Sequence, residues 1–192
     1  MLREFKADLH IHTCLSPCAD DDMSPQNIVK QAEIKRLDII GICDHNSSEN
    51  VAATQKIGKN KRITVIGGIE AASQEEVHIL ALFDDKKDVF EFQAVIYENL
   101  SGFNDDGVFG KQLIINENDE IVGINDRLLI GATSLPLQEI VQTIYSLKGL
   151  AIASHIDRGR FSIISQLGFI PEGLPITKTS LPSLGATSDI SR

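Results

Sequence analysis

Short apolar runs and helix-like stripes alternate along most of the chain. Segments typical of strands fall at about residues 4–12, 39–43, 63–70, 77–83 and 150–155, and those at 39–43 and 150–155 have the apolar character of buried strands. Between these runs, apolar residues recur every three or four positions, as from Val89 to Leu100, which is the spacing of an amphipathic helix. The succession of strand and helix predicts an α/β fold with a parallel sheet and right-handed crossovers.

Three further helices are expected, and two of them have a recognisable start. Ser24 offers a capping hydroxyl and Pro25 suits the first helical turn, so a helix is expected to begin there. A second helix is expected over about residues 48–59, and Pro136 opens a third, whose apolar stripe begins at Leu137.

Two segments do not follow the alternating pattern. Residues 101–129 predict only a hairpin, with strands at 112–116 and 121–124. Residues 171–192 are rich in Ser, Thr, Gly, Pro and Leu and show no period. Because the chain has 192 residues with 42% apolar content, we expect a single domain over 1–192.

The first predicted strand carries three potential metal ligands. Side chains alternate along a strand, so Asp8, His10 and His12 are expected on one face, with Leu9 and Ile11 on the other. Two imidazoles at this spacing can share one metal ion, and Asp8 can hold a ring N–H or bind the ion directly. The alternative is a polar strand face that happens to carry two histidines.

Other acids and imidazoles also collect at predicted strand ends. Asp44 and His45 follow the second strand, Glu70 ends the third, His78 lies near the start of the fourth and His155 ends the last. Mixed imidazole and carboxylate ligands suit zinc, manganese or iron, and a bridging carboxylate such as Glu70 can hold two ions close together. The pattern predicts a metal site at the carboxyl rim of the sheet.

These motifs resemble the PHP (polymerase and histidinol phosphatase) domain of metal-dependent phosphoesterases. The matching stretches are Asp8-Leu-His-Ile-His-Thr, Cys-Asp44-His45-Asn, Gly68-Ile-Glu70 with His78, and Ala153-Ser-His155. The resemblance implies a distorted seven-stranded β/α (TIM-like) barrel with up to three metal ions, and a substrate-facing insertion at 101–129. It also implies the following ligands: His10, His12 and Glu70 for one ion, Glu70, His78 and His155 for a second, and Asp20 with His45 for a third. Asp44 would support the site or help in proton transfer.

The chain departs from the family pattern near its end. A Ser-Asp-x-His segment usually closes the site, whereas this sequence has Ser188-Asp189-Ile190-Ser191. Asp189 can still complete the first ion, but the third lacks a ligand. Either the site holds two ions well, or the barrel is incomplete at its C-terminus and partly open.

The resulting prediction is a hydrolase that cleaves a phosphomonoester or phosphodiester of a small molecule or nucleotide, with two or three divalent ions. Arg158 and Arg160 could bind a substrate phosphate, although surface arginines would look the same in sequence. A catalytically impaired metal-binding module, with a regulatory or scaffold role, is the main alternative because the terminal histidine is missing. Hydrolysis of a C–N bond fits less well, since Glu70 and the Asp-His-Asn element suit that class poorly.

Composition narrows the class of partners. The formal net charge of −9 argues against general nucleic-acid binding, unless metal ions reverse the local field. No apolar run approaches the roughly 20 residues that span a bilayer, and the N-terminus lacks the apolar core of a signal peptide, so a cytoplasmic protein is expected.

Cys14, Cys18 and Cys43 have no fourth ligand at suitable spacing, which favours buried or idle thiols over a separate zinc site.

Overall fold

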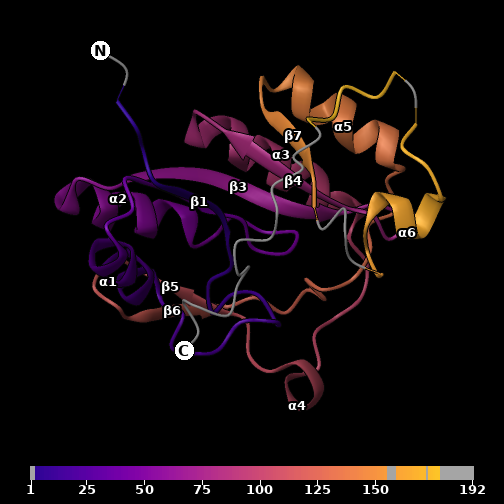
Figure 1. Ribbon diagram of the computed structural model, residues 1–192. Coiled ribbons are helices and arrows are strands. Elements are labelled where there is room, and N and C mark those ends of the chain that lie inside the picture. The colour runs from indigo at the N-terminus through magenta and orange to yellow at the C-terminus, as the bar shows by residue number, and fades with distance from the viewer. Residues whose placement is uncertain (1–2, 155–158, 172, 178–192) are drawn as a thin grey trace.

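A curled five-stranded sheet lies at the centre of the protein (Figure 1). The structure is a computed structural model that describes residues 3–154, 159–171 and 173–177. The strands, in their order across the sheet, are β1 (Ala7–Ile11), β2 (Ile39–Ile42), β3 (Thr64–Ala72), β4 (His78–Phe83) and β7 (Leu150–Ala153). All five predicted strands are confirmed.

The direction of β4 corrects the prediction of a parallel sheet. β1, β2 and β3 are parallel, but β4 is antiparallel to both of its neighbours. The connection from β3 to β4 is too short for a crossover, which needs a dozen or more residues, and Ser73 N–H instead donates to the Val77 carbonyl at 3.0 Å in a tight turn. His78 therefore pairs with Ala72, so the start of β4 lies at the rim where β3 ends.

The four longer helices are α1 (Pro25–Lys35), α2 (Val51–Lys61), α3 (Lys86–Asn99) and α5 (Leu137–Ser146); α4 (Asp106–Phe109) and α6 (Ile163–Leu167) are short. The predicted cap of α1 is confirmed, because the Ser24 side chain accepts a hydrogen bond from the Asn27 N–H. The predicted helices after β2 and Pro136 are confirmed as α2 and α5.

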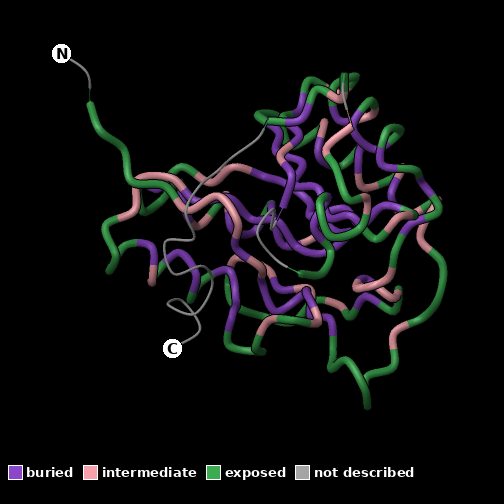
Figure 2. Tube along the Cα trace, turned by 45° about the vertical axis from the view of Figure 1, so that its right-hand side comes forward, coloured by how far each residue is buried: buried purple, intermediate pink, exposed green. Residues whose placement is uncertain are grey.

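The helices cover one face of the sheet. In β4, Ile79 and Ala81 pack in the large cluster that includes residues of α3 and α5, whereas Leu80 and Leu82 pack with Cys43 on the other face. This alternation continues in β3 and β7, and the buried positions follow the strands and the inward helix faces (Figure 2). The face away from the helices is the one that carries the candidate site.

The predicted hairpin is confirmed as β5 (Leu113–Ile115) and β6 (Ile121–Ile124), a separate two-stranded sheet. It packs against the loop after β1, where Leu113 and Ile115 contact Cys14. In the described part of the chain the strands form these two sheets, and a closed seven-stranded barrel stays a prediction, as do the domain limits and the role of residues 101–129 as an insertion.

Asn50 joins the hairpin to the rest of the protein. Its side-chain N–H donates to Thr13 Oγ1 at 2.9 Å and to the Leu113 carbonyl at 3.0 Å, and its Oδ1 accepts from the Ile115 N–H at 2.9 Å. Asn50 is fully buried, so each of these groups loses its partner without access to water when the side chain is removed.

We expect Asn50→Ala to lower the free energy of unfolding by about 2 kcal/mol. We also expect faster hydrogen exchange at the amides of residues 113–115. Urea unfolding and hydrogen–deuterium exchange measure the two effects. Asn60→Ala, an exposed change on the same helix, is the matched control. Unchanged exchange at residues 113–115 in Asn50→Ala would contradict this role.

Among the described residues, no helix combines the length and apolar character needed to cross a membrane.

Candidate metal centre

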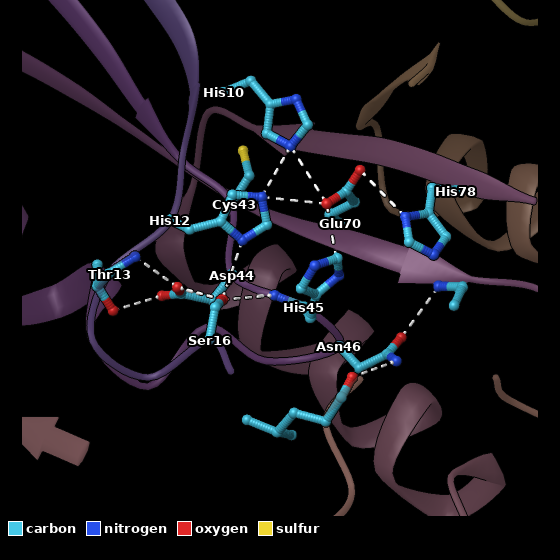
Figure 3. Close-up of polar contacts among 12 residues, drawn as sticks. His10, His12, Thr13, Ser16, Cys43, Asp44, His45, Asn46, Glu70 and His78 are labelled. Atoms are coloured by element: carbon cyan, nitrogen blue, oxygen red, sulfur yellow. Dashed lines mark hydrogen bonds and ion pairs between the residues drawn. The ribbon is translucent and has the colours of Figure 1, made fainter. Parts of the chain in front are cut away.

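Glu70 lies at the centre of a group of imidazoles (Figure 3). Its carboxylate is fully buried on β3. Glu70 Oε2 lies 3.2 Å from His10 Nε2, 3.1 Å from His12 Nε2 and 3.4 Å from His45 Nδ1. Glu70 Oε1 lies 3.4 Å from His78 Nδ1. One carboxylate therefore faces imidazole nitrogens from four places in the chain.

β1 reaches this centre through an irregular register. Asp8 pairs with Ile40, but Ile11 pairs with Ile42. Between these two pairs β1 therefore contains one residue more than β2, as in a β-bulge. Leu9 then packs near Cys43, while Ile11 packs in the cluster beneath α1. The prediction that Leu9 and Ile11 share a face is wrong, because the extra residue changes the alternation.

Despite the irregular register, His10 and His12 converge, with 3.0 Å between their Nε2 atoms. Asp8 Oδ1 accepts from the backbone N–H of His10 at 3.3 Å. Asp8 therefore contacts the backbone beside the imidazoles, and its role in holding a ring N–H or in binding the ion directly stays a prediction.

His45 is placed by pairing between the end of β2 and β3. The Glu70 N–H donates to the Asp44 carbonyl and the Asn46 N–H donates to the Glu70 carbonyl, both at 3.0 Å, which sets His45 opposite Glu70. Asn46 holds a left-handed backbone, with φ of 50°. Its side chain fixes that turn by accepting from the Ala72 N–H and donating to the carbonyls of Leu129 and Gly131.

The loop after β1 is fastened to Asp44. The fully buried Asp44 carboxylate accepts from the Thr13 N–H at 2.6 Å, the Thr13 hydroxyl at 2.8 Å and the Ser16 hydroxyl at 2.7 Å. The Ser16 Oγ in turn accepts from the His45 N–H and lies 3.0 Å from His12 Nδ1. Because the one Ser16 proton is given to Asp44, His12 Nδ1–H is the donor to Ser16, and His12 Nε2 keeps its lone pair for the centre when the ring is neutral.

Burial and charge set the protonation of the imidazoles. Burial lowers the pKa of His45 to about 3, so this ring is neutral and can offer a lone pair. Burial also acts to lower the pKa of His12, but hydrogen bonds to Cys18 and Glu70 and their charges outweigh it and raise that pKa well above its usual value. Burial raises the pKa of Asp44, and the charge of His12, followed by the donors of Ser16 and Thr13, opposes this shift.

The donor atoms suit a divalent metal. Among the described residues, three groups each bring their ligand atoms within 4.8 Å of one another: His10, His12 and Glu70; His45, Glu70 and His78; and His12, Cys18 and His45. Imidazole nitrogen with carboxylate oxygen is a donor set for zinc, manganese or iron, and Glu70 belongs to two of the groups. The Glu70 carboxylate therefore offers an oxygen to each of these two groups.

The structure brings together five of the residues predicted from sequence, namely His10, His12, His45, Glu70 and His78. Asp20 is exposed in the loop and belongs to none of the three groups. His155, Arg158 and Asp189 lie outside the described residues, so their predicted roles stay predictions.

Sequence reasoning passed over two residues of the loop. Cys18 was interpreted as an idle thiol, yet its sulfur lies in one of the three groups. Ser16 was not singled out, although it joins Asp44 to His12. The proximity of both residues to the histidine strand, in Thr13-Cys-Leu-Ser-Pro-Cys, was the one indication that the sequence offered.

The fold and the centre define an α/β protein with a carboxylate and imidazole site at one rim of its sheet. The PHP domain family matches residues 8–158, and the chain belongs to this family.

Two relatives and one solved structure are similar to parts of the chain. An uncharacterized protein of Methanocaldococcus jannaschii, MJ1587, is 35% identical over 86 residues, which cover 41% of this chain and 50% of that protein. A 5'-3' exoribonuclease of Haemophilus influenzae is 30% identical over 84 residues, covering 42% of this chain and 30% of the relative. The lesion-specific endonuclease EndoQ of Pyrococcus furiosus superposes with a TM-score of 0.58 at 19% identity, over 87% of this chain and 40% of that structure. The chain thus aligns with half or less of each of these proteins.

Proposed function

We propose that this protein is a metal-dependent phosphoesterase with two or three divalent ions, of zinc, manganese or iron, at the Glu70 centre. The observation that carries the proposal is the buried Glu70 carboxylate with imidazole nitrogens of His10, His12, His45 and His78 at 3.1–3.4 Å. His155 and Asp189 are proposed as further ligands by their family positions. Ions bound there supply an activated water at neutral pH and offset the charge that develops on a phosphoryl group.

A phosphodiester of a nucleotide or a nucleic-acid end is the proposed substrate. The exoribonuclease and the endonuclease named above both act on nucleic acids by their names, so the expectation that general nucleic-acid binding is disfavoured finds no support in the comparisons. The net charge of −9 still disfavours electrostatic binding along an extended nucleic-acid backbone. Cations at the centre reverse the sign of the field locally, which favours capture of one or a few phosphates.

The residues around the centre are proposed to have different roles in metal binding, positioning and substrate binding. Neutral His45 presents a lone pair toward Glu70 without a proton to remove, whereas the raised pKa of His12 means that an ion binding at its Nε2 would displace a proton from that ring. Asp44 is proposed as a positioning residue, because both of its oxygens bind the loop that carries Ser16. Arg158, close to His155 in sequence, is proposed to meet a substrate phosphate.

Hydrolysis of paired model esters tests the proposal. The metal-free protein is reloaded with Mn²⁺ or Zn²⁺ and assayed on bis(p-nitrophenyl) phosphate, on p-nitrophenyl phosphate and on a 5'-phosphorylated oligoribonucleotide. We expect turnover that needs the metal, is lost with chelator and is faster on the diester than on the monoester. Tight metal uptake without turnover on any of the three would favour the impaired metal-binding module.

A further inference from the structure

Cys18 lies beside the candidate centre and not on an unrelated surface. Its Sγ and ring nitrogens of His12 and His45 all lie within 4.8 Å of one another. Cys18 is the exposed thiol of the chain, whereas Cys14 and Cys43 are buried. The sulfur is thus accessible to solvent on one side and faces two imidazoles on the other.

The loop that carries Cys18 is held by several hydrogen bonds. Ser16 N–H donates to the Thr13 carbonyl and Ala19 N–H donates to the Ser16 carbonyl, both at 3.0 Å, so consecutive turns fold the loop back toward β1. The Ser16 hydroxyl is bonded to buried Asp44 and accepts from the His45 N–H. Cys18, two residues further on, is therefore fixed near His12 and His45 by the network that orients them.

The three donors match the coordination chemistry of zinc. Zinc binds thiolate at about 2.3 Å and imidazole nitrogen at about 2.0–2.1 Å in a tetrahedral arrangement, which places ligand atoms roughly 3.3–3.8 Å apart. Ligand atoms already within 4.8 Å reach that spacing by small side-chain rotations. A sulfur ligand favours zinc over magnesium or manganese, which prefer oxygen.

We propose that Cys18, with His12 and His45, binds a zinc-type divalent ion through its thiolate on the loop side of the centre. This inference rests on the proposed metal-dependent function and assigns to Cys18 the place that the sequence had given to Asp20. When the ion binds, the Sγ–H proton and the proton on the His12 nitrogen that meets the ion leave to solvent, and the freed lone pairs of sulfur and nitrogen form the bonds to the metal. His12 belongs both to this group and to the group of His10, His12 and Glu70. Because one imidazole nitrogen binds one ion, the ions of the two groups compete for His12.

Cobalt(II) reports on a sulfur ligand directly, because thiolate coordination produces a sulfur-to-cobalt charge-transfer absorption in the near ultraviolet. Metal-free full-length protein is titrated with Co²⁺, alongside Cys18→Ser, Cys18→Asp and Asp20→Asn. We expect the absorption in the wild type and in Asp20→Asn, and its loss in both Cys18 variants. Co²⁺ that binds without this absorption would overturn the role of Cys18 and leave the proposed function standing, whereas no Co²⁺ binding at all would overturn both.

Metal preference and thiol reactivity give two independent readouts. We expect Cys18→Asp to bind Zn²⁺ at least about 10-fold more weakly than the wild type while its Mn²⁺ affinity is kept or increased. We also expect Zn²⁺ to slow the reaction of the exposed thiol with a disulfide reagent. Zinc affinity unchanged in Cys18→Asp, or a thiol that reacts equally fast with and without zinc, would overturn the proposal. Because Cys18 is exposed, circular dichroism is expected to show the wild-type fold in both variants.

Discussion

Replacing Glu70 by Gln is expected to remove most bound metal and to lower metal-dependent phosphodiesterase activity by on the order of 100-fold or more. The volume is nearly conserved, so the change isolates the negative charge that faces the four imidazoles. Loss of a residue that merely supports a ligand costs roughly 10–100-fold in metal affinity or activity, and loss of a bridging ligand is expected to cost more. Metal content by elemental analysis and initial rates measure the two effects.

Glu91→Gln is the matched control, because it makes the same chemical change at a half-exposed glutamate on α3. It is expected to keep wild-type metal content and rate. Wild-type metal content in Glu70→Gln would contradict the central position given to this residue.

Asp44→Ala is expected to have the second largest effect, on stability and on metal affinity together. The change leaves the Thr13 N–H, the Thr13 hydroxyl and the Ser16 hydroxyl without their acceptor in a fully buried site. We expect the free energy of unfolding to fall by about 3 kcal/mol. We expect metal affinity to fall by about 10–100-fold, because Ser16 no longer orients His12.

Chemical denaturation and a competitive metal-chelator titration measure these two losses. Asp84→Ala, at an exposed aspartate after β4, is the control and should behave as the wild type. Asp44→Asn keeps one acceptor oxygen and is expected to lie between the two. A stable Asp44→Ala protein with unchanged metal affinity would show that the loop does not depend on this carboxylate.

The strands and most of the site could be predicted because both depend on local patterns. Buried strands appear as apolar runs, and the polar residues that end them stand out against those runs. His10, His12, His45 and Glu70 meet because parallel strands bring their carboxyl ends to one rim. That geometry needs no knowledge of individual contacts.

His78 was predicted for the site, but the strand direction that places it there was not. The five residues from Ser73 to Val77 leave no room for a crossover, so the reversal of β4 could have been found from the connection length alone. The extra residue in β1 had no such indication, since no glycine or proline marks the segment from Asp8 to Ile11. Its effect on Leu9 and Ile11 therefore appeared only in the structure.

The position of Cys18 depends on contacts far apart in sequence. The loop is folded back by Asp44, 28 residues from Ser16, and no spacing rule relates a loop cysteine to such a partner. The family resemblance and the position after the histidine strand had indicated Asp20 as a ligand, and the turns of the loop leave Asp20 exposed. Local sequence thus indicated the loop, and the choice between Asp20 and Cys18 as the ligand stays a prediction.

Anomalous X-ray diffraction from crystals grown with Zn²⁺ or Mn²⁺ tests the convergence of these ligands most directly. We predict at least two metal peaks that share Glu70, each about 2.0–2.2 Å from a carboxylate oxygen and from an imidazole nitrogen. One peak is expected near His10 and His12, and another near His78. Fully loaded crystals without a peak at Glu70, or with metal bound only elsewhere, would contradict the account.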